Sequence, residues 1–347
     1  MNPGPSNDRF LKACCGEPVD CTPVWFMRQA GRYMPEYRKI REQHSLLEIC
    51  KIPELCAQVT LQPIEKLGVD AAILFSDIML PLGGMGVEYE FKAGVGPIIH
   101  NPIRGETDVN ALRVIEPEAD LLFVLEAIRM LREAPTLDVP LIGFSGAPFT
   151  LASYMIEGGP PKNFSQTKRM MYQKPALWHL LLEKLSEVVV KYLRAQIRSG
   201  VQAVQLFDSW VGCLSPQDYQ AFVLPHSRRI FQGLEGMDVP CIHFGTGTAT
   251  LLTLISQAGG DVIGVDWRIP LDQAWVLLGE GVGIQGNLDP AVLLGPFAEV
   301  EKRTTDILKR AKNRPGHIFN LGHGVLPDTP VDHVARLVEV VHEQSRR

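Results

Sequence analysis

Residues 23–37 read PVWFMRQAGRYMPEY, an apolar run that ends directly at an arginine. The run Val24–Met27 is followed by Arg28, and Arg32 comes four residues later, across a small Gln-Ala-Gly segment. Arginine is seldom fully buried unless it is paired, and its planar guanidinium matches a carboxylate in a bidentate manner. The stretch therefore resembles a strand that delivers two guanidinium groups to a pocket for an acidic ligand. A pair of solvated loop arginines is the alternative.

Seven further apolar or β-branched runs follow, and a longer helical pattern separates each run from the next. Nearly continuous apolar runs are typical of parallel strands that are buried on both faces. With Val24–Met27 the set has eight members: Ala71–Phe75, Leu141–Phe144, Ala203–Phe207, Cys241–Phe244, Val262–Val265, Gly283–Gln285 and Ile318–Leu321 are the others.

This alternation predicts an α/β fold, and eight units predict a single (β/α)8 TIM-type barrel with its active site at the C-terminal ends of the strands. A doubly wound open sheet is the alternative, but no GxGxxG follows the first run. The helices are predicted at Pro53–Leu67, Asp120–Arg132, Pro175–Ser199, Pro216–Gly233, Ala249–Ala258, Leu271–Leu278, Pro290–Lys312 and Val331–Gln344.

No domain boundary interrupts this pattern. Residues 1–20 are expected to be a loosely ordered N-terminal segment, and residues 21–347 the barrel catalytic domain. Two segments read as insertions. Gly83–Pro97 is bounded by glycines and predicts a hairpin or lid beyond the second strand, and Glu157–Lys174 predicts a mobile loop.

Composition excludes several classes of function. The 347 residues carry a net charge of −5 without a basic run, which argues against nucleic acid and against a membrane surface as partners. Seven cysteines without a CxxC pair argue against a disulfide framework and fit a reducing compartment. The N-terminus lacks the regions of a signal peptide, so a cytoplasmic location is expected.

Polar residues follow every apolar run, where a barrel places its active site. Asp77 comes directly after ILFS and His323 lies between two glycines, and neither is easily explained by packing. Asp208, Asp266 and Asp289 could instead be helix N-caps. Tyr154 could be a core tyrosine. The remaining strand-end segments are Ser145–Pro148, Ser209–Trp210, Gly245–Thr248 and Asn287–Leu288.

Some types of chemistry lack their residues. No lysine ends a run, so a Schiff-base nucleophile is missing, and no HExxH, paired-cysteine or P-loop motif suggests a metal or nucleotide. Cys241 and His243 alternate on one strand, but a buried cysteine and a hydrogen-bonded histidine explain them better than a metal site. The chain is equipped for acid–base and electrostatic work on an anionic ligand, with no metal and no cofactor.

These motifs resemble those of the uroporphyrinogen decarboxylase family from about Thr22 to about Glu343. The marks are MRQAGRYMPEYR, AAILFSDIMLPLGGMG, GFSGAPFTLASYMIEGG, QLFDSWVG, HFGTGT, GVDW, QGNLDP and FNLGHGVLPDTP. The resemblance implies a single (β/α)8 barrel, usually a homodimer, without metal or organic cofactor. It also implies a small-molecule substrate: four acetate side chains of uroporphyrinogen are decarboxylated to methyls, giving coproporphyrinogen.

The resemblance also assigns roles to residues. Arg28 and Arg32 match the family's carboxylate-binding arginines in the RQAGR loop, whose Gln29, Ala30 and Gly31 are expected to line the substrate. Asp77 matches the aspartate that contacts the pyrrole N–H groups. Side chains around the substrate are matched by Tyr154, Ser209 and His323, and Tyr37 stands where an aromatic residue is common.

The chemistry of the reaction fits these residues. A protonated pyrrole serves as the electron sink that a cofactor usually supplies, and a carboxylate at Asp77 would stabilise that cation. The proton could come from Arg28, Arg32, His323 or a held water, and the sequence leaves these open.

Two other functions compete with this interpretation. A corrinoid-linked methyltransferase of the same barrel superfamily would need a His-x-Cys zinc motif, but His243 is followed by Phe244 and Gly245. A non-catalytic tetrapyrrole-binding protein would not need a carboxylate that faces the pyrrole nitrogens.

Overall fold

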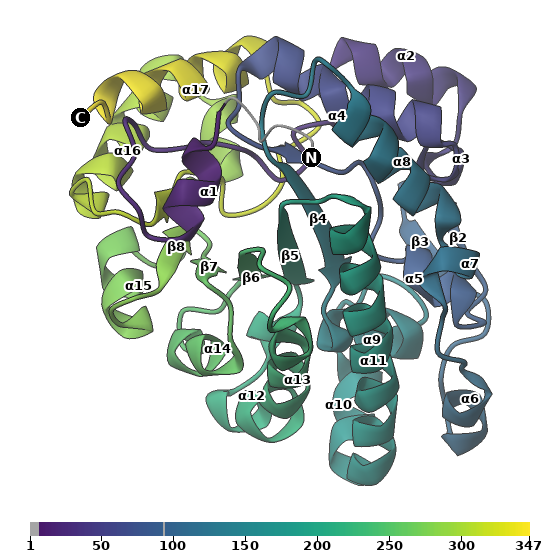
Figure 1. Ribbon diagram of the computed structural model, residues 1–347. Helices are drawn as coiled ribbons and strands as arrows, with labels where there is room; N and C mark the ends of the chain where they lie inside the picture. Colours follow the sequence, from purple (N-terminus) through teal and green to yellow (C-terminus); the bar gives the residue numbers. More distant parts are fainter. Residues whose placement is uncertain (1–6, 93) are drawn as a thin grey trace.

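The computed structural model describes residues 7–92 and 94–347, and its central element is a curled, parallel, seven-stranded sheet (Figure 1). The strand order is β1-β4-β5-β6-β7-β8-β9, so each strand pairs with the next strand of the main sheet. Their bounds are β1 Ala72–Ile73, β4 Leu141–Gly146, β5 Ala203–Asp208, β6 Cys241–Gly245, β7 Val262–Gly264, β8 Gly283–Gln285 and β9 His317–Ile318. The predicted α/β class and parallel order are confirmed.

The main helices alternate with the strands along the chain, from α4 before β1 to α17 after β9, and cover the outside of the sheet (Figure 1). Four of them have the predicted bounds: α4 Pro53–Leu67, α11 Pro175–Ser199, α15 Leu271–Leu278 and α17 Val331–Gln344. Proline in the first turn fixes the start of α4 and α11, and left-handed Gly68 ends α4. The other helices that follow strands on the outside are α8 Leu122–Glu133, α13 Leu224–Leu234, α14 Leu252–Ala258 and α16 Phe297–Ala311.

Two predicted helices are each divided by a proline. The segment predicted as Pro216–Gly233 forms α12 (Pro216–Phe222) and α13, with Pro225 in the first turn of α13. The segment predicted as Pro290–Lys312 forms the 3-10 helix η2 (Pro290–Leu294) and α16, with Pro296 between them. Proline has no N–H to continue a helical ladder, so a new helix begins there instead.

Shorter helices fill the connections. In addition, β2 (Tyr89–Lys92) and β3 (Gly96–Ile99) form an antiparallel pair, which confirms the hairpin predicted at residues 83–97. The short helices are α2 Pro35–Gln43, α3 Leu46–Lys51, α5 Leu80–Gly84, α6 Glu106–Ala111, α7 Pro117–Asp120, α9 Pro148–Glu157, α10 Ser165–Gln173 and the 3-10 helix η1 Val211–Cys213.

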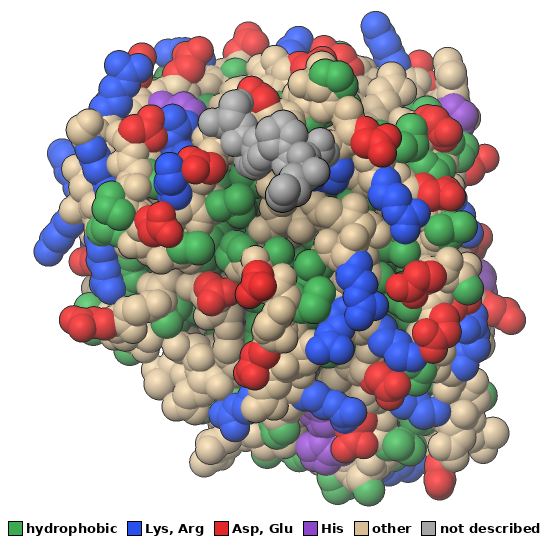
Figure 2. All heavy atoms as spheres, viewed as in Figure 1, with side chains coloured by type: hydrophobic (Ala, Val, Ile, Leu, Met, Phe, Trp, Pro, Cys, Tyr) green, Lys and Arg blue, Asp and Glu red, His purple; other side chains and the backbone are tan. Residues whose placement is uncertain are grey.

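The surface carries no dominant sign on the face shown in Figure 2, where basic and acidic side chains are interspersed. Over the residues that the structure describes, no helix combines the length and apolar character needed to cross a membrane.

The N-terminal segment corrects an expectation. Residues 1–20 were expected to be loosely ordered, but α1 (Arg9–Cys14) packs Phe10 and Ala13 into the core with no exposed surface. Two fully buried side chains give this helix enough apolar contact to hold it against the sheet near β9. Residues 1–6 lie outside the described part of the chain.

The run at residues 24–27 does not form the predicted eighth strand. Val24 makes one isolated parallel bridge to Phe319, while its carbonyl accepts from the Asp70 N–H at 2.8 Å on the other side. Side chains take the backbone donors that a strand ladder would use. The N–H groups of Val24, Phe26 and Met27 donate to Asp70 Oδ2, Gln29 Oε1 and Asn320 Oδ1.

We call the contacts of residues 24–27 with Asp70 and Phe319 the seam of the sheet. Asp70 is the buried residue at its centre. Its carboxylate, 1% exposed, accepts from Val24 N–H at 2.8 Å and pairs with Arg9 at 2.5 Å and with His342 of α17 at 2.7 Å. Burial opposes the charge of Asp70, but His342 and the other donors hold its pKa below the usual value. One side chain therefore joins the N-terminal helix, the C-terminal helix and the run that carries Arg28.

Replacing this carboxylate tests its structural role. Asp70→Asn should lower the free energy of unfolding by about 3 kcal/mol, because Arg9, His342 and the Val24 N–H lose the buried anion that they share. Chemical denaturation at pH 7 measures the change, with exposed Asp328→Asn as the control. Because the folded pKa is depressed, the contribution of Asp70 is present above about pH 4 and is lost as the pH falls further. Equal stability of the two variants at pH 7 would contradict the role.

Candidate active site

The C-terminal ends of the parallel strands form one rim, and most of the predicted residues lie there. Asp77 follows β1, Tyr154 lies on α9 after β4, Ser209 follows β5, and His323 follows β9. Arg28 and Arg32 follow the seam at Val24. The sheet topology brings together side chains that are almost 300 residues apart in the sequence.

Asp77 supplies an anion to the rim without a cation bonded to it. Its side chain is partly buried, and Oδ1 accepts from the Met79 N–H at 2.8 Å. No ion pair to Asp77 occurs within residues 7–92 and 94–347. Burial raises the pKa of Asp77 to about 6, against the opposing effects of the Met79 N–H and the Arg28 charge. The carboxylate is thus poised to change charge near neutral pH.

The position of the Arg28 side chain is set by its backbone conformation and by its contact with Gly324. Arg28 has a left-handed φ of 59°, and the inner carbons of its side chain lie over Gly324, where an added Cβ would come within 2.5 Å of Cδ. The guanidinium groups of Arg28 and Arg32 have neither ion pairs nor hydrogen bonds among the described residues, and both side chains are exposed. Two unpaired cations at the rim suit an acidic ligand.

His323 is a neutral hydrogen-bond donor in this arrangement. The Gly324 N–H donates to Nδ1 at 2.6 Å, which assigns the ring proton to Nε2. Burial and then the charge of Arg28 lower the pKa of His323 to about 4. At neutral pH the ring is therefore uncharged, and Nε2–H is available to a ligand oxygen.

Tyr154 and Ser209 complete the group. The Tyr154 ring packs edge-on against Trp210 with a centroid distance of 5.9 Å. Burial raises the pKa of Tyr154, Asp77 adds to the rise and Arg28 opposes it, so these charges share one environment. The Ser209 hydroxyl is partly exposed and makes no hydrogen bond within the described part of the chain.

Other residues of the RQAGR segment lie differently. Gln29 is 1% exposed; its side chain accepts from Phe26 N–H and donates to the Ala71 carbonyl at 3.0 Å. The side chain predicted to line the substrate is therefore committed to backbone groups and stabilises the turn. Ala30 and Gly31 are partly exposed beside the arginines. Tyr37 is buried against Phe75, with a centroid distance of 5.4 Å, and supports the segment that leads to Asp77.

Of the three aspartates considered as N-caps, only Asp289 is one, since its Oδ1 accepts from Ala291 N–H at the start of η2. Asp208 accepts from the Thr150 hydroxyl, and Asp266 accepts from the Gly247 N–H at 2.6 Å. Both join neighbouring loops of the rim. Hydrophobic periodicity carries no signal for such pairings, because their partners are distant in sequence.

Cys241 and His243 do not lie at the rim. His243 is 1% exposed and packs against Phe231 of α13, with a centroid distance of 5.1 Å. Within residues 7–92 and 94–347 no group of three or more His, Cys, Asp or Glu residues is arranged to hold a metal.

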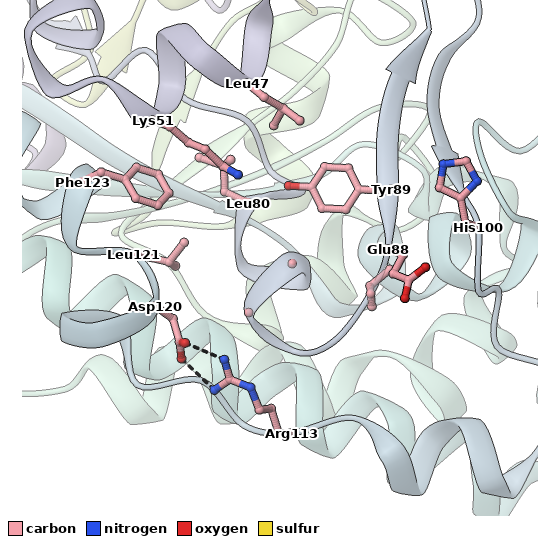
Figure 3. Close-up of a pocket in the computed structure, with 13 residues that line it drawn as sticks. Leu47, Lys51, Leu80, Glu88, Tyr89, His100, Arg113, Asp120, Leu121 and Phe123 are labelled. Carbon is pink, nitrogen blue, oxygen red and sulfur yellow. Dashed lines mark hydrogen bonds and ion pairs between the residues drawn. The ribbon is translucent and has the colours of Figure 1, made fainter.

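A separate hollow of about 550 Å³ lies on the flank of the molecule (Figure 3). Lys51 and Tyr89 point toward each other across it, and Arg113 pairs with Asp120 at its edge. None of the predicted site residues lines this hollow, whereas they gather at the rim. The rim is therefore the candidate active site.

The fold is that of an α/β protein of the TIM-barrel type, and its rim carries two arginines without ion pairs among the described residues. A methyltransferase from Methanosarcina mazei has a similar fold, with a TM-score of 0.81 at 22% identity over 98% of this chain and 99% of that one. The family model described as "Uroporphyrinogen decarboxylase (URO-D)" matches residues 5–344.

Curated relatives agree with that match. The uroporphyrinogen decarboxylase of Carboxydothermus hydrogenoformans is 58% identical over 98% of this chain and 97% of its own length. The uroporphyrinogen decarboxylase of Thermus thermophilus is 54% identical over 97% and 98%. The chain belongs to the uroporphyrinogen decarboxylase family.

The contact between Arg28 and Gly324 yields a test of the site. Gly324→Ala should displace Arg28, because the new methyl would collide with the inner carbons of the side chain and not with its mobile end. Loss of a charge-assisted contact weakens binding by roughly 10- to 100-fold, so uroporphyrin should bind about 10-fold more weakly or worse. Fluorescence titration measures this, with Gly105→Ala, where the methyl meets no atom within 4 Å, as the control. Unchanged affinity in Gly324→Ala would remove Arg28 from the site.

Proposed function

We propose that this protein removes carbon dioxide from the four acetate side chains of uroporphyrinogen III and leaves methyl groups, giving coproporphyrinogen III. Family membership over nearly the whole chain supports the reaction. The observation that carries its assignment to the rim is the juxtaposition of Asp77, an anion without a bonded cation, with the unpaired guanidinium of Arg28.

Substrate carboxylates are bound by the cations and hydroxyls of the rim. Arg28 and Arg32 offer planar donor pairs, and the Ser209 hydroxyl and His323 Nε2–H offer neutral donors. Tyr154 contributes its ring beside Trp210. The macrocycle lies with its pyrrole N–H groups toward Asp77.

Asp77 stabilises the charge that develops during the reaction. A proton adds to the pyrrole carbon that bears the acetate, and the ring becomes a cation next to the carboxylate. The C–C bond then breaks, carbon dioxide leaves, and the bonding electron pair flows into the cationic ring. Protonation of the resulting exocyclic CH₂ and loss of the ring proton restore the pyrrole, so each acetate anion consumes one proton overall. A fixed charge in a partly dry site stabilises such a step far more than it would in water.

The protonation state of His323 reduces the number of candidate proton donors. With its pKa lowered to about 4, His323 is almost entirely neutral at pH 7, so it serves as a hydrogen-bond donor to substrate. The proton then comes from Arg28, Arg32 or a water held by them.

Closure of the barrel and the oligomeric state form a second part of the proposal. We infer that residues 24–27 take the place of the eighth strand in a closed (β/α)8 barrel. On one side the Trp25 N–H donates to the Phe319 carbonyl and the Phe319 N–H donates to the Pro23 carbonyl, and on the other side the Asp70 N–H donates to the Val24 carbonyl. The active form is proposed to be a cytoplasmic homodimer, for which light scattering supplies the test of mass.

Anaerobic incubation with uroporphyrinogen III, followed by chromatography of the oxidised porphyrins, tests the reaction. The products should progress from eight carboxylates to four. A protein that binds the macrocycle and leaves all eight carboxylates in place would be a carrier instead.

Asp77→Asn should be the most damaging single change to the chemistry. The amide keeps the size of the side chain and can still accept a hydrogen bond, so the substrate binds, but the charge opposite the pyrrole cation is lost. Removal of one such preorganised group commonly costs ~10²–10³-fold in rate. All four decarboxylations should slow, as measured by the time course of each intermediate. Turnover near the parent rate would assign Asp77 a structural role.

The pH profile gives an independent test of the same charge. The pKa of Asp77 is raised to about 6, so below that pH the carboxyl is increasingly protonated and cannot stabilise a cation. The value of kcat/KM should therefore fall about tenfold per pH unit below pH 6, and Asp77→Asn should lack this decline. Buried Asp208, whose pKa is raised to about 7, also titrates in this range. The variant Asp208→Asn is the control for it and should still show the decline of kcat/KM below pH 6. A flat parent profile between pH 5 and 7 would contradict the role.

A further inference from the structure

The peptide bond between Ser209 and Trp210 is held on both sides by threonine hydroxyls. The Trp210 N–H donates to Thr150 Oγ1 at 3.3 Å, and the Ser209 carbonyl accepts from Thr246 Oγ1 at 2.6 Å. Thr150 lies on α9, which follows β4, and Thr246 follows β6. The two polar groups of a single peptide are thus fixed from the two units that flank β5.

Thr150 is itself oriented by a buried carboxyl group. Its hydroxyl has one proton, which it donates to Asp208 Oδ1 at 2.8 Å, and this leaves a lone pair to accept from Trp210. Asp208 has no exposed surface, and its Oδ2 has no hydrogen-bond partner among the described residues. Burying a carboxyl group with one oxygen unpaired is costly, so the contact with Thr150 calls for an explanation beyond local packing.

The backbone around this peptide has no room to move. A Cβ added at Gly212 would lie 2.1 Å from the Thr246 carbonyl oxygen, so the segment after Trp210 packs directly on the segment after β6. The Gly247 N–H in that segment is held in turn by Asp266. The Ser209 hydroxyl has no hydrogen-bond partner among the described residues, and it stands on a backbone that is fixed on each side.

We propose that Asp208, Thr150 and Thr246 form a clamp that positions the Ser209 hydroxyl for a substrate carboxylate, an inference that rests on the proposed function. Thr150 and Asp208 have no exposed surface, and Thr246 donates its hydroxyl proton to the Ser209 carbonyl, so the three act on the substrate through Ser209 as positioning residues. The clamp needs an acceptor at position 208 and not a charge, because a carboxylate, a carboxylic acid and an amide all accept from Thr150.

A double-mutant cycle between Thr150→Val and Ser209→Ala tests the clamp. Thr150→Val removes both hydrogen bonds of the hydroxyl and should raise KM for uroporphyrinogen roughly 2- to 10-fold, the effect of losing one neutral hydrogen bond. In the Ser209→Ala background the same change should leave KM where Ser209→Ala alone puts it. The loss of thermal stability should be the same in both backgrounds, which separates positioning from stability.

Conservative variants and a control complete the design. Thr150→Ser and Asp208→Asn keep the donor and the acceptor and should retain the parent KM and pH profile. Thr304→Val is the control, because Thr304 is equally buried but bonds only within α16. If Thr150→Val does not fold, Thr246→Val tests the same peptide from its other side.

The outcomes separate the two proposals. Additive effects of Thr150→Val and Ser209→Ala on KM, or a parent-like KM in Ser209→Ala, would overturn the clamp while decarboxylation stands. Absence of carbon dioxide release from the parent protein would overturn the proposed function itself.

Discussion

The rest of the structure depends on one hydrogen bond, which the Val24 N–H donates to the buried carboxylate of Asp70. It fixes the position of the run that carries Arg28, and it replaces the regular ladder that would have made this run a strand. The same carboxylate binds Arg9 near the start of the chain and His342 near its end. The run that carries Arg28 and the two terminal helices are therefore stabilised together.

At the rim, burial shifts the pKa of an acid and the pKa of a base in opposite directions, and both shifts favour the uncharged form. It raises the pKa of Asp77 and lowers the pKa of His323, so each group is shifted toward its neutral form. The unpaired guanidinium groups of the rim are those of Arg28 and Arg32, which make no ion pair among the described residues. A ligand with several carboxylates would thus meet two cations, neutral donors and the Asp77 carboxyl group, an arrangement that suits the proposed formation of a cationic ring.

The sequence predicted the sheet and four long helices well, because apolar runs and first-turn prolines are local signals. It missed the breaks at Pro225 and Pro296, where apolar periodicity continues through a proline that starts a new helix. The apolar run predicts a strand at residues 24–27, whereas three of its four N–H groups donate to side chains, one of them as remote as Asn320. The partners of Gln29 and Asp208 could not be predicted for the same reason, since they are set by tertiary contact. The gathering of Asp77, Arg28 and His323 at one rim was predictable, since parallel strands end at one edge.

The most direct test of the account is the structure of the protein with coproporphyrinogen III bound under anaerobic conditions. The account predicts that the macrocycle lies at the rim with pyrrole N–H groups about 3 Å from the Asp77 carboxylate oxygens and with side-chain carboxylates on Arg28 or Arg32. A macrocycle bound in the flank hollow of Figure 3, or one at the rim with no pyrrole nitrogen within hydrogen-bond distance of Asp77, would contradict it.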